Sequence, residues 1–236
     1  MDSQSPIYVR AHDAPAVYRL VRTAIRLGLR IFSPRLRLLN PERLEQPGPV
    51  ILVITHPRSL PAALLLISSL DHQVHCLLPS GELRGFFGRL AAWALGMQEV
   101  DLNPEEQNRW IGPCLDVLAN HEAIALFAEQ APQDGTSRAP VADFAAGLSM
   151  KAILRGPEQI YPTIYPVHCF LRAGRNAAPL LCADRPIASQ DFLPTVAEDL
   201  AAASQQLAEA VQNSIGANVF GLPETELGRF RQEIEN

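Results

Sequence analysis

The chain has 236 residues, a length that suits one sizeable domain and does not require a second. Hydrophobic residues make up 47% of it and charged residues 19%, a composition typical of a packed α/β core. The net charge of −5 argues against a nucleic-acid partner, because the overall field would repel the phosphate backbone. We therefore expect a single domain over residues 1–236.

The four cysteines and the apolar runs indicate in which cellular compartment we expect the protein. The cysteines, at positions 76, 114, 169 and 182, form no CxxC pair, which is typical of reduced thiols in a cytosolic protein. The first residues, MDSQSPIYVR, lack the basic and then apolar pattern of a signal peptide. Uncharged apolar runs such as 59–70 are shorter than the roughly 20 residues that cross a bilayer. The sequence predicts a cytoplasmic protein without a transmembrane segment.

The first predicted element is a basic amphipathic helix over residues 15–32, within a segment of residues 14–33. Its arginines follow a 3-4-4 spacing that places them on one stripe, at positions 19, 22, 26 and 30. The apolar residues that we expect on the opposite face are Val17, Leu20, Val21, Ala24, Ile25, Leu27, Ile31 and Phe32. Such a helix contacts an anionic membrane surface, or packs its apolar face on the domain and leaves its arginines in water. The pattern leaves both interpretations open.

Strand-like and helix-like segments alternate along the rest of the chain. Strands are predicted over residues 49–55, 74–78, 97–102, 123–128, 160–167 and 180–183. Helices are predicted over residues 59–70, 84–95, 105–120, 144–154 and 193–215. The alternation predicts an α/β fold with a mainly parallel central sheet flanked by helices, followed by a polar tail over residues 222–236.

Two polar residues follow predicted buried strands directly. His56 comes after VILVIT, and Glu129 comes after AIALFA. Ligands of open α/β sheets bind where strands end and helices begin, so these two residues are candidates for a shared site.

The motifs around these residues resemble those of the glycerol-phosphate and lysophospholipid acyltransferase family. That family has a strand ending in Asn-His with Asp five residues after the histidine, then Phe-Pro-Glu-Gly, then a strand with a Val-Pro core. This chain has THPRSLP at 55–61, FAEQ at 127–130 and IYPTIYP at 160–166. The stretches LRLLNPERLEQPGPVILV, LPSGELRGFFGRLAAWALGMQEVDL and DFAAGLSMKAIL also resemble connecting segments of the family. The similarity covers residues 17–167, most of the chain.

The resemblance implies a glycerolipid acyltransferase-like fold and transfer of an acyl group from an acyl-CoA or acyl-carrier protein to a hydroxyl of a lipid acceptor. His56 would be the general base. The substrate-binding residues would be Arg58, Ser59, Glu129, Gln130 and Arg138, with the arginines on phosphate oxygens. No cofactor and no metal is expected, because the donor carries its own pantetheine thioester. The expected location is the cytoplasm, peripheral on the inner face of the membrane, with residues 15–32 in contact with it.

The chain departs from the family pattern in three places. Pro61 stands where the aspartate belongs, Thr55 replaces the asparagine, and Ala128 and Gln130 replace the Pro and Gly beside Glu129. Proline cannot accept a hydrogen bond from the imidazole or carry charge. A spatial substitute, Glu82 or Asp101, would preserve activity. The alternative is a pseudoenzyme of the same fold that binds a lipid or acyl carrier or assists a partner protein.

Two other patterns suggest different chemistry. Asp71-His72-x-x-His75-Cys76 is a compact set of metal-ligand types, although its spacing fits no closed site and a polar turn before a strand explains it. Gly147-Leu148-Ser149-Met150-Lys151 lacks the final glycine of a serine-hydrolase elbow. No phosphate-binding glycine loop is present, which argues against nucleotide chemistry.

Overall fold

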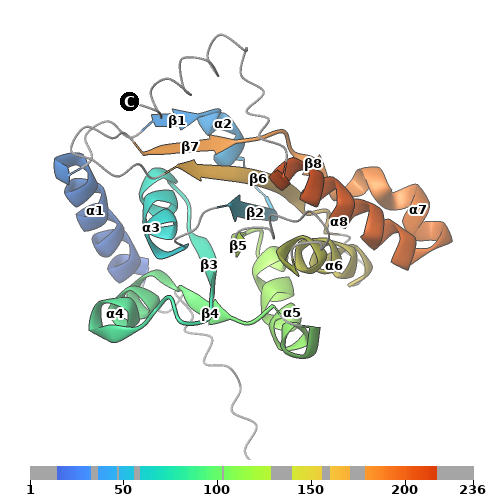
Figure 1. Ribbon diagram of the computed structural model, residues 1–236, viewed down its shortest axis with the longest axis horizontal. Coiled ribbons are helices and arrows are strands. Elements are labelled where there is room, and N and C mark those ends of the chain that lie inside the picture. Colours follow the sequence, from blue (N-terminus) through green and yellow to red (C-terminus); the bar gives the residue numbers. More distant parts are fainter. Residues whose placement is uncertain are drawn as a thin grey trace, which may run out of the picture.

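A central sheet with helices on both faces makes up the described part of the chain in this computed structural model (Figure 1). The structure describes residues 15–32, 37–46, 48–55, 59–102, 104–128, 140–155, 160–170 and 179–216. The strands lie in the order β1 (Arg37–Leu39), β7 (Leu180–Ala183), β6 (Thr163–Phe170), β2 (Val50–Thr55), β5 (Ala123–Ala128), β3 (Val74–Pro79) and β4 (Gln98–Val100). The short β8 (Ile187–Ala188) pairs with β6.

Five of these strands run in the same direction. β6, β2, β5, β3 and β4 are paired in parallel, whereas β7 and β8 are antiparallel to β6. β1 is parallel to β7 and forms the edge beside it. The predicted α/β class, with a mostly parallel sheet flanked by helices, is therefore confirmed. The antiparallel strands make the sheet mixed.

The helices form two layers, one on each face of the sheet (Figure 1). One layer contains α1 (Pro15–Phe32), α3 (Ser59–Ser69) and α4 (Gly85–Leu95). The other contains α5 (Pro104–Ala119), α6 (Pro140–Leu154) and α8 (Leu200–Gly216). Because successive side chains of a strand point to opposite faces, Leu52 and Ile54 of β2 join the first core, whereas Ile51 and Val53 join the second. A continuous apolar run such as VILVIT suits a strand that is buried on both sides.

The predicted last helix, over residues 193–215, is broken in the structure. It consists of α7 (Leu193–Glu198) and α8, separated by Asp199 in an extended conformation. The Asp199 carboxylate accepts hydrogen bonds from the backbone N–H groups of Ala201 at 2.8 Å and Ala202 at 3.2 Å. Asp199 therefore caps the N-terminus of α8, where these N–H groups have no intrahelical partner.

Other boundaries differ by a few residues. α6 begins at Pro140 rather than at residue 144, because proline suits the first turn of a helix, where its missing N–H is not needed. Four short elements were not predicted, namely β1, α2 (Pro41–Leu44), β8 and the 3-10 turn η2 (Ser189–Phe192). The predicted polar tail lies outside the described residues. Within the described ranges, none of the helices is both long enough and apolar enough to cross a membrane.

Candidate functional site

The candidate site lies where β2 and its neighbour β5 end, beside β6. Thr55, the last residue of β2, is the register partner of Ala128 on one side and of His168 on the other. The chain therefore leaves β2 and β5 at adjacent points, at the C-terminal ends of these two parallel strands. His56 and Glu129 are the next residues in the sequence after these two strand ends. The parallel register thus brings together Thr55 and Ala128, the strand ends that directly precede His56 and Glu129 in the sequence.

Most of the predicted site residues lie outside the described residues. These are His56, Arg58, Glu129, Gln130 and Arg138. Ser59 is described: it is the first residue of α3, and its side chain is buried. Its predicted contact with a substrate stays a prediction.

The start of α3 carries a carboxylate from another part of the chain. α3 has no acidic residue of its own in the first turn, and Pro61 is exposed there. The backbone N–H of Leu60 donates a long hydrogen bond of 3.4 Å to Oε2 of Glu82. A carboxylate at this end of a helix is stabilised by the unsatisfied N–H groups and the helix dipole. Glu82 therefore lies at the same helical turn as Pro61.

The turn that holds Glu82 is fixed on both sides. It connects β3 to α4 and contains Gly81 at a φ of 96°, a conformation that glycine adopts readily. Leu83, which follows Glu82, is buried. Its backbone N–H donates to Oε1 of Glu99 on β4 at 2.5 Å. Asp101, the other predicted substitute for the aspartate, is exposed just after β4. The structure brings Glu82 to the start of α3.

His168 is a buried residue beside the site that the sequence did not indicate. Burial lowers the pKa of its imidazole, and the negative charge of Asp184 opposes that shift. Asp184 is held by a hydrogen bond of 3.0 Å from the Ser214 hydroxyl and by its own N–H, which donates to the Pro166 carbonyl at 2.9 Å. The predicted strand ended at residue 167, one residue before this histidine. A longer predicted strand would have contained His168 as a polar residue in a buried strand, which is the signal that could have found it.

The metal-site interpretation of residues 71–76 does not match their geometry. Asp71 binds the guanidinium groups of Arg22 and Arg26, whereas Nε2 of His75 lies 2.7 Å from Oε2 of Glu122. Cys76 is buried, which raises the pKa of its thiol and keeps it protonated. Among the residues that the structure describes, no group of three or more His, Cys, Asp or Glu side chains could hold a metal ion.

The hydrolase-like motif lies inside a helix. Ser149 is a fully buried residue of α6, and its hydroxyl donates to the Ala145 carbonyl at 2.9 Å. A nucleophilic serine needs an exposed hydroxyl on a strand-to-helix turn. This segment is therefore not a nucleophile elbow, in agreement with its missing final glycine.

The fold defines the chain as an α/β protein with a mostly parallel, mixed sheet. No protein-family model matches the chain, and no curated protein is similar enough in sequence to count as a relative.

Proposed function

We propose that the protein is an acyltransferase that moves an acyl group from an acyl-CoA or acyl-carrier-protein thioester to a hydroxyl of a lipid-type acceptor, such as a lysophospholipid or glycerol phosphate. The observation that carries the proposal is the register of β2 and β5, whose adjacent ends precede His56 and Glu129. Residues separated by more than 70 positions in the chain thereby follow neighbouring strand ends. α/β proteins bind their ligands at these C-terminal strand ends.

In the proposed reaction, His56 removes the proton from the acceptor hydroxyl as its oxygen attacks the thioester carbonyl carbon. The new C–O bond forms, the C–S bond breaks, and the sulfur leaves as a thiol after taking the proton from the imidazolium. Arg58 and Arg138 bind phosphate oxygens of the substrates through their planar guanidinium groups. Ser59, Glu129 and Gln130 contact the polar part of the acceptor.

Glu82 takes the role of the missing aspartate in this proposal. Its carboxylate reaches the first turn of α3, the turn that contains position 61 and directly follows the His56 segment in the sequence. A carboxylate at that turn stabilises the imidazolium that forms when the base accepts a proton. Glu82 would act through His56 and is therefore a positioning residue.

We place the protein in the cytoplasm, at the inner face of the membrane, where its lipid acceptors are found. The second candidate function is that of a pseudoenzyme that binds a lipid or acyl carrier, or assists a partner protein. It is favoured by Pro61, which is exposed and offers no carboxylate at the position of the usual aspartate.

The test is turnover, followed by mass spectrometry. The purified chain is incubated with acyl-CoA and acyl-carrier-protein donors and with a panel of hydroxyl and amine acceptors. His56→Asn is compared with the matched variant His121→Asn, which changes an exposed histidine in the turn before β5. Position 121 has a φ of 57°, which asparagine tolerates well.

An acyl product that is lost in His56→Asn and retained in His121→Asn supports the enzyme. No product from any of the three proteins, together with retained lipid or carrier, supports the pseudoenzyme. A product that both variants form equally removes His56 from the mechanism.

A further inference from the structure

The inner face of α1 packs on the domain. Tyr18 is buried there, and four partly buried residues of the helix pack against the core that α3 and α4 share: Val17, Val21, Ile25 and Leu29. These residues recur every three or four positions and so lie on one face of the helix.

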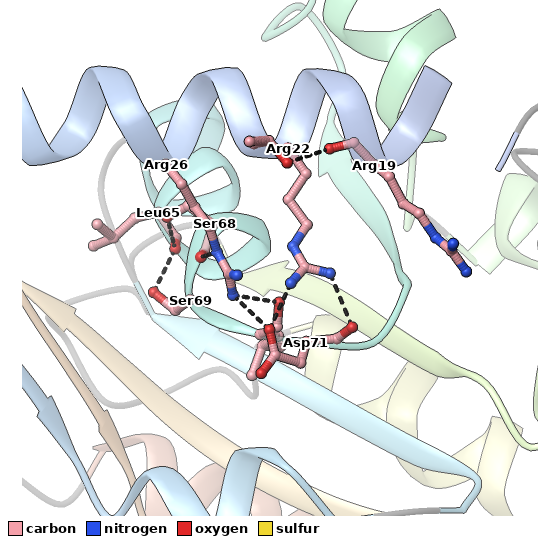
Figure 2. Close-up of polar contacts among 9 residues, drawn as sticks. Arg19, Arg22, Arg26, Leu65, Ser68, Ser69 and Asp71 are labelled. Carbon is pink, nitrogen blue, oxygen red and sulfur yellow. Dashed lines mark hydrogen bonds and ion pairs between the residues drawn. The ribbon is translucent and has the colours of Figure 1, made fainter. Parts of the chain in front are cut away.

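Two of the four arginines of α1 also turn inward. Figure 2 shows the side chains of Arg22 and Arg26 extending from α1 toward Asp71, whereas Arg19 extends away from that cluster. Arg22 donates to the Asp71 carboxylate at 2.6 Å and to its backbone carbonyl at 2.9 Å. Arg26 donates to the carboxylate at 2.8 Å and to carbonyls of Ser68 and Leu70. The four arginines therefore do not form one solvent-exposed stripe, as the spacing had suggested. Two of them, Arg22 and Arg26, instead hold the helix on the domain.

The outer face of α1 exposes large aliphatic side chains. Leu20 is 71% exposed, Leu27 60% and Ile31 66%. Their spacings of seven and four residues place them on one line with the exposed Ala24. We call these four residues the outer stripe of α1. The apolar arc of the helix is thus wider than the surface that the domain covers.

Positive charge borders the outer stripe. Arg19 and Arg30 are exposed, and at 100° per residue they lie beside Leu27 on the outward half of the helix. α1 contains no acidic residue, although the chain as a whole has a net charge of −5. An anionic surface would therefore attract this helix and repel most of the rest of the protein.

We propose that the outer stripe of α1 inserts into the headgroup region of an anionic lipid bilayer. Leu20, Leu27 and Ile31 enter the boundary with the acyl chains, while Arg19 and Arg30 bind lipid phosphates. Arg22 and Arg26 stay on Asp71 and hold the helix to the domain. The proposal rests on the membrane location proposed above and names the residues that make the contact. Membrane binding is measured without turnover, so its failure is distinguishable from a failure of the transfer reaction.

The experiment is co-sedimentation of the full chain with vesicles of phosphatidylcholine, with and without phosphatidylglycerol. The unmodified protein is expected to bind the anionic vesicles more tightly. Leu27→Gln/Ile31→Gln should weaken that binding by about tenfold for each side chain, since burying one such side chain is worth at least a factor of ten. Arg19→Gln/Arg30→Gln should reduce the preference for anionic vesicles by about fivefold per arginine.

The matched control is Leu154→Gln, at the C-terminal end of α6 on the opposite layer, where the leucine is 55% exposed. It should bind vesicles as the unmodified protein does. All variants change exposed residues to a good helix former, so their unfolding temperatures should agree and report intact folding.

Three results would overturn the proposal. One is an unmodified protein that binds neither kind of vesicle. Another is a loss of binding in Leu154→Gln as large as that in Leu27→Gln/Ile31→Gln. The third is a dimer in light scattering that Leu27→Gln/Ile31→Gln dissociates, which would assign the outer stripe to a second copy of the chain.

Discussion

Nη2 of Arg26 lies 2.8 Å from Oδ1 of Asp71, and this contact joins two segments that are 45 residues apart in the chain. The same guanidinium also donates to the Leu70 carbonyl at 3.1 Å and to the Ser68 carbonyl. The last carbonyls of a helix have no intrahelical partner, and a cation beside them is favoured by the helix dipole. Arg26 therefore closes the C-terminal end of α3 and fixes α1 in place at once.

Replacing Arg26 should cost more stability than replacing a neighbouring arginine. We expect Arg26→Gln to lower the free energy of unfolding by about 1–2 kcal/mol, because it removes charged hydrogen bonds to α3. Arg19→Gln makes the same chemical change on the outward side and should stay within about 0.5 kcal/mol of the unmodified protein. Urea unfolding of the two variants measures the difference. Equal losses would contradict the docking role of Arg26.

The contribution of Asp71 to the free energy of unfolding should depend on pH and on salt concentration. The hydrogen bond and charge of Arg26, with a smaller effect of Arg22, lower the pKa of its carboxyl below the ordinary 3.8. A lowered folded pKa means that the stabilisation is present above pH 3.8 and is lost as the pH falls further, through the folded value. Because the side chain is 76% exposed, we expect Asp71→Asn to cost only about 0.5–1 kcal/mol at neutral pH.

The measurement for Asp71 is the difference in unfolding free energy between the two proteins as a function of pH, in which other titrating groups cancel. High salt should shrink the difference as well. A difference that stays constant as the pH falls below 3.8 would show that the ion pairs of Asp71 do not cause the loss of stability in Asp71→Asn.

Glu82 should affect turnover through its charge. We expect Glu82→Gln to lower kcat by about 10²–10⁴ with little change in KM, because loss of an orienting carboxylate costs up to about 10⁴ in a comparable triad. Glu99→Gln is the matched control, since Glu99 also accepts a backbone hydrogen bond, from Leu83, at the neighbouring turn. The pH profile of kcat should change only in the Glu82 variant. A fall in both variants alike would indicate a structural role for Glu82.

The four cysteines should be unreactive in the folded protein. All four are free and buried. Burial raises the pKa of the thiols of Cys114 and Cys169 to about 12 and that of Cys182 to about 11, and it raises that of Cys76 as well. Since the thiolate is the nucleophile, we expect no alkylation by iodoacetamide at neutral pH until the chain is unfolded in denaturant. Fast modification of the native protein would contradict this burial.

Local patterns predicted most elements but not the contacts between them. The apolar run before Thr55 predicted the buried β2 correctly, because such a run suits a strand covered on both faces. The arginine spacing in α1 predicted a helix over the observed residues but not the direction of Arg22 and Arg26. Their partner Asp71 is distant in the sequence, and helical periodicity carries no information about it.

The same limit applies to the candidate site. The sequence left Glu82 and Asp101 as alternative substitutes for the aspartate, and the path of the turn after β3 brings Glu82 to Leu60. Likewise, the break before α8 depends on one capping carboxylate, that of Asp199, within an otherwise continuous helical pattern. Single polar contacts of this kind have no periodicity from which they could be predicted.

The pairing of β1 with β7 has a consequence for synthesis of the chain on the ribosome. Residues 37–39 lie beside residues 180–182, so the edge that they form cannot be completed until more than three quarters of the chain has been made. α1, which precedes β1, can reach Asp71 much earlier, once α3 has emerged. Since contacts between distant residues form late, the N-terminal part of the chain should dock in two stages. The helix joins its layer first, and the strand that follows it waits for β7.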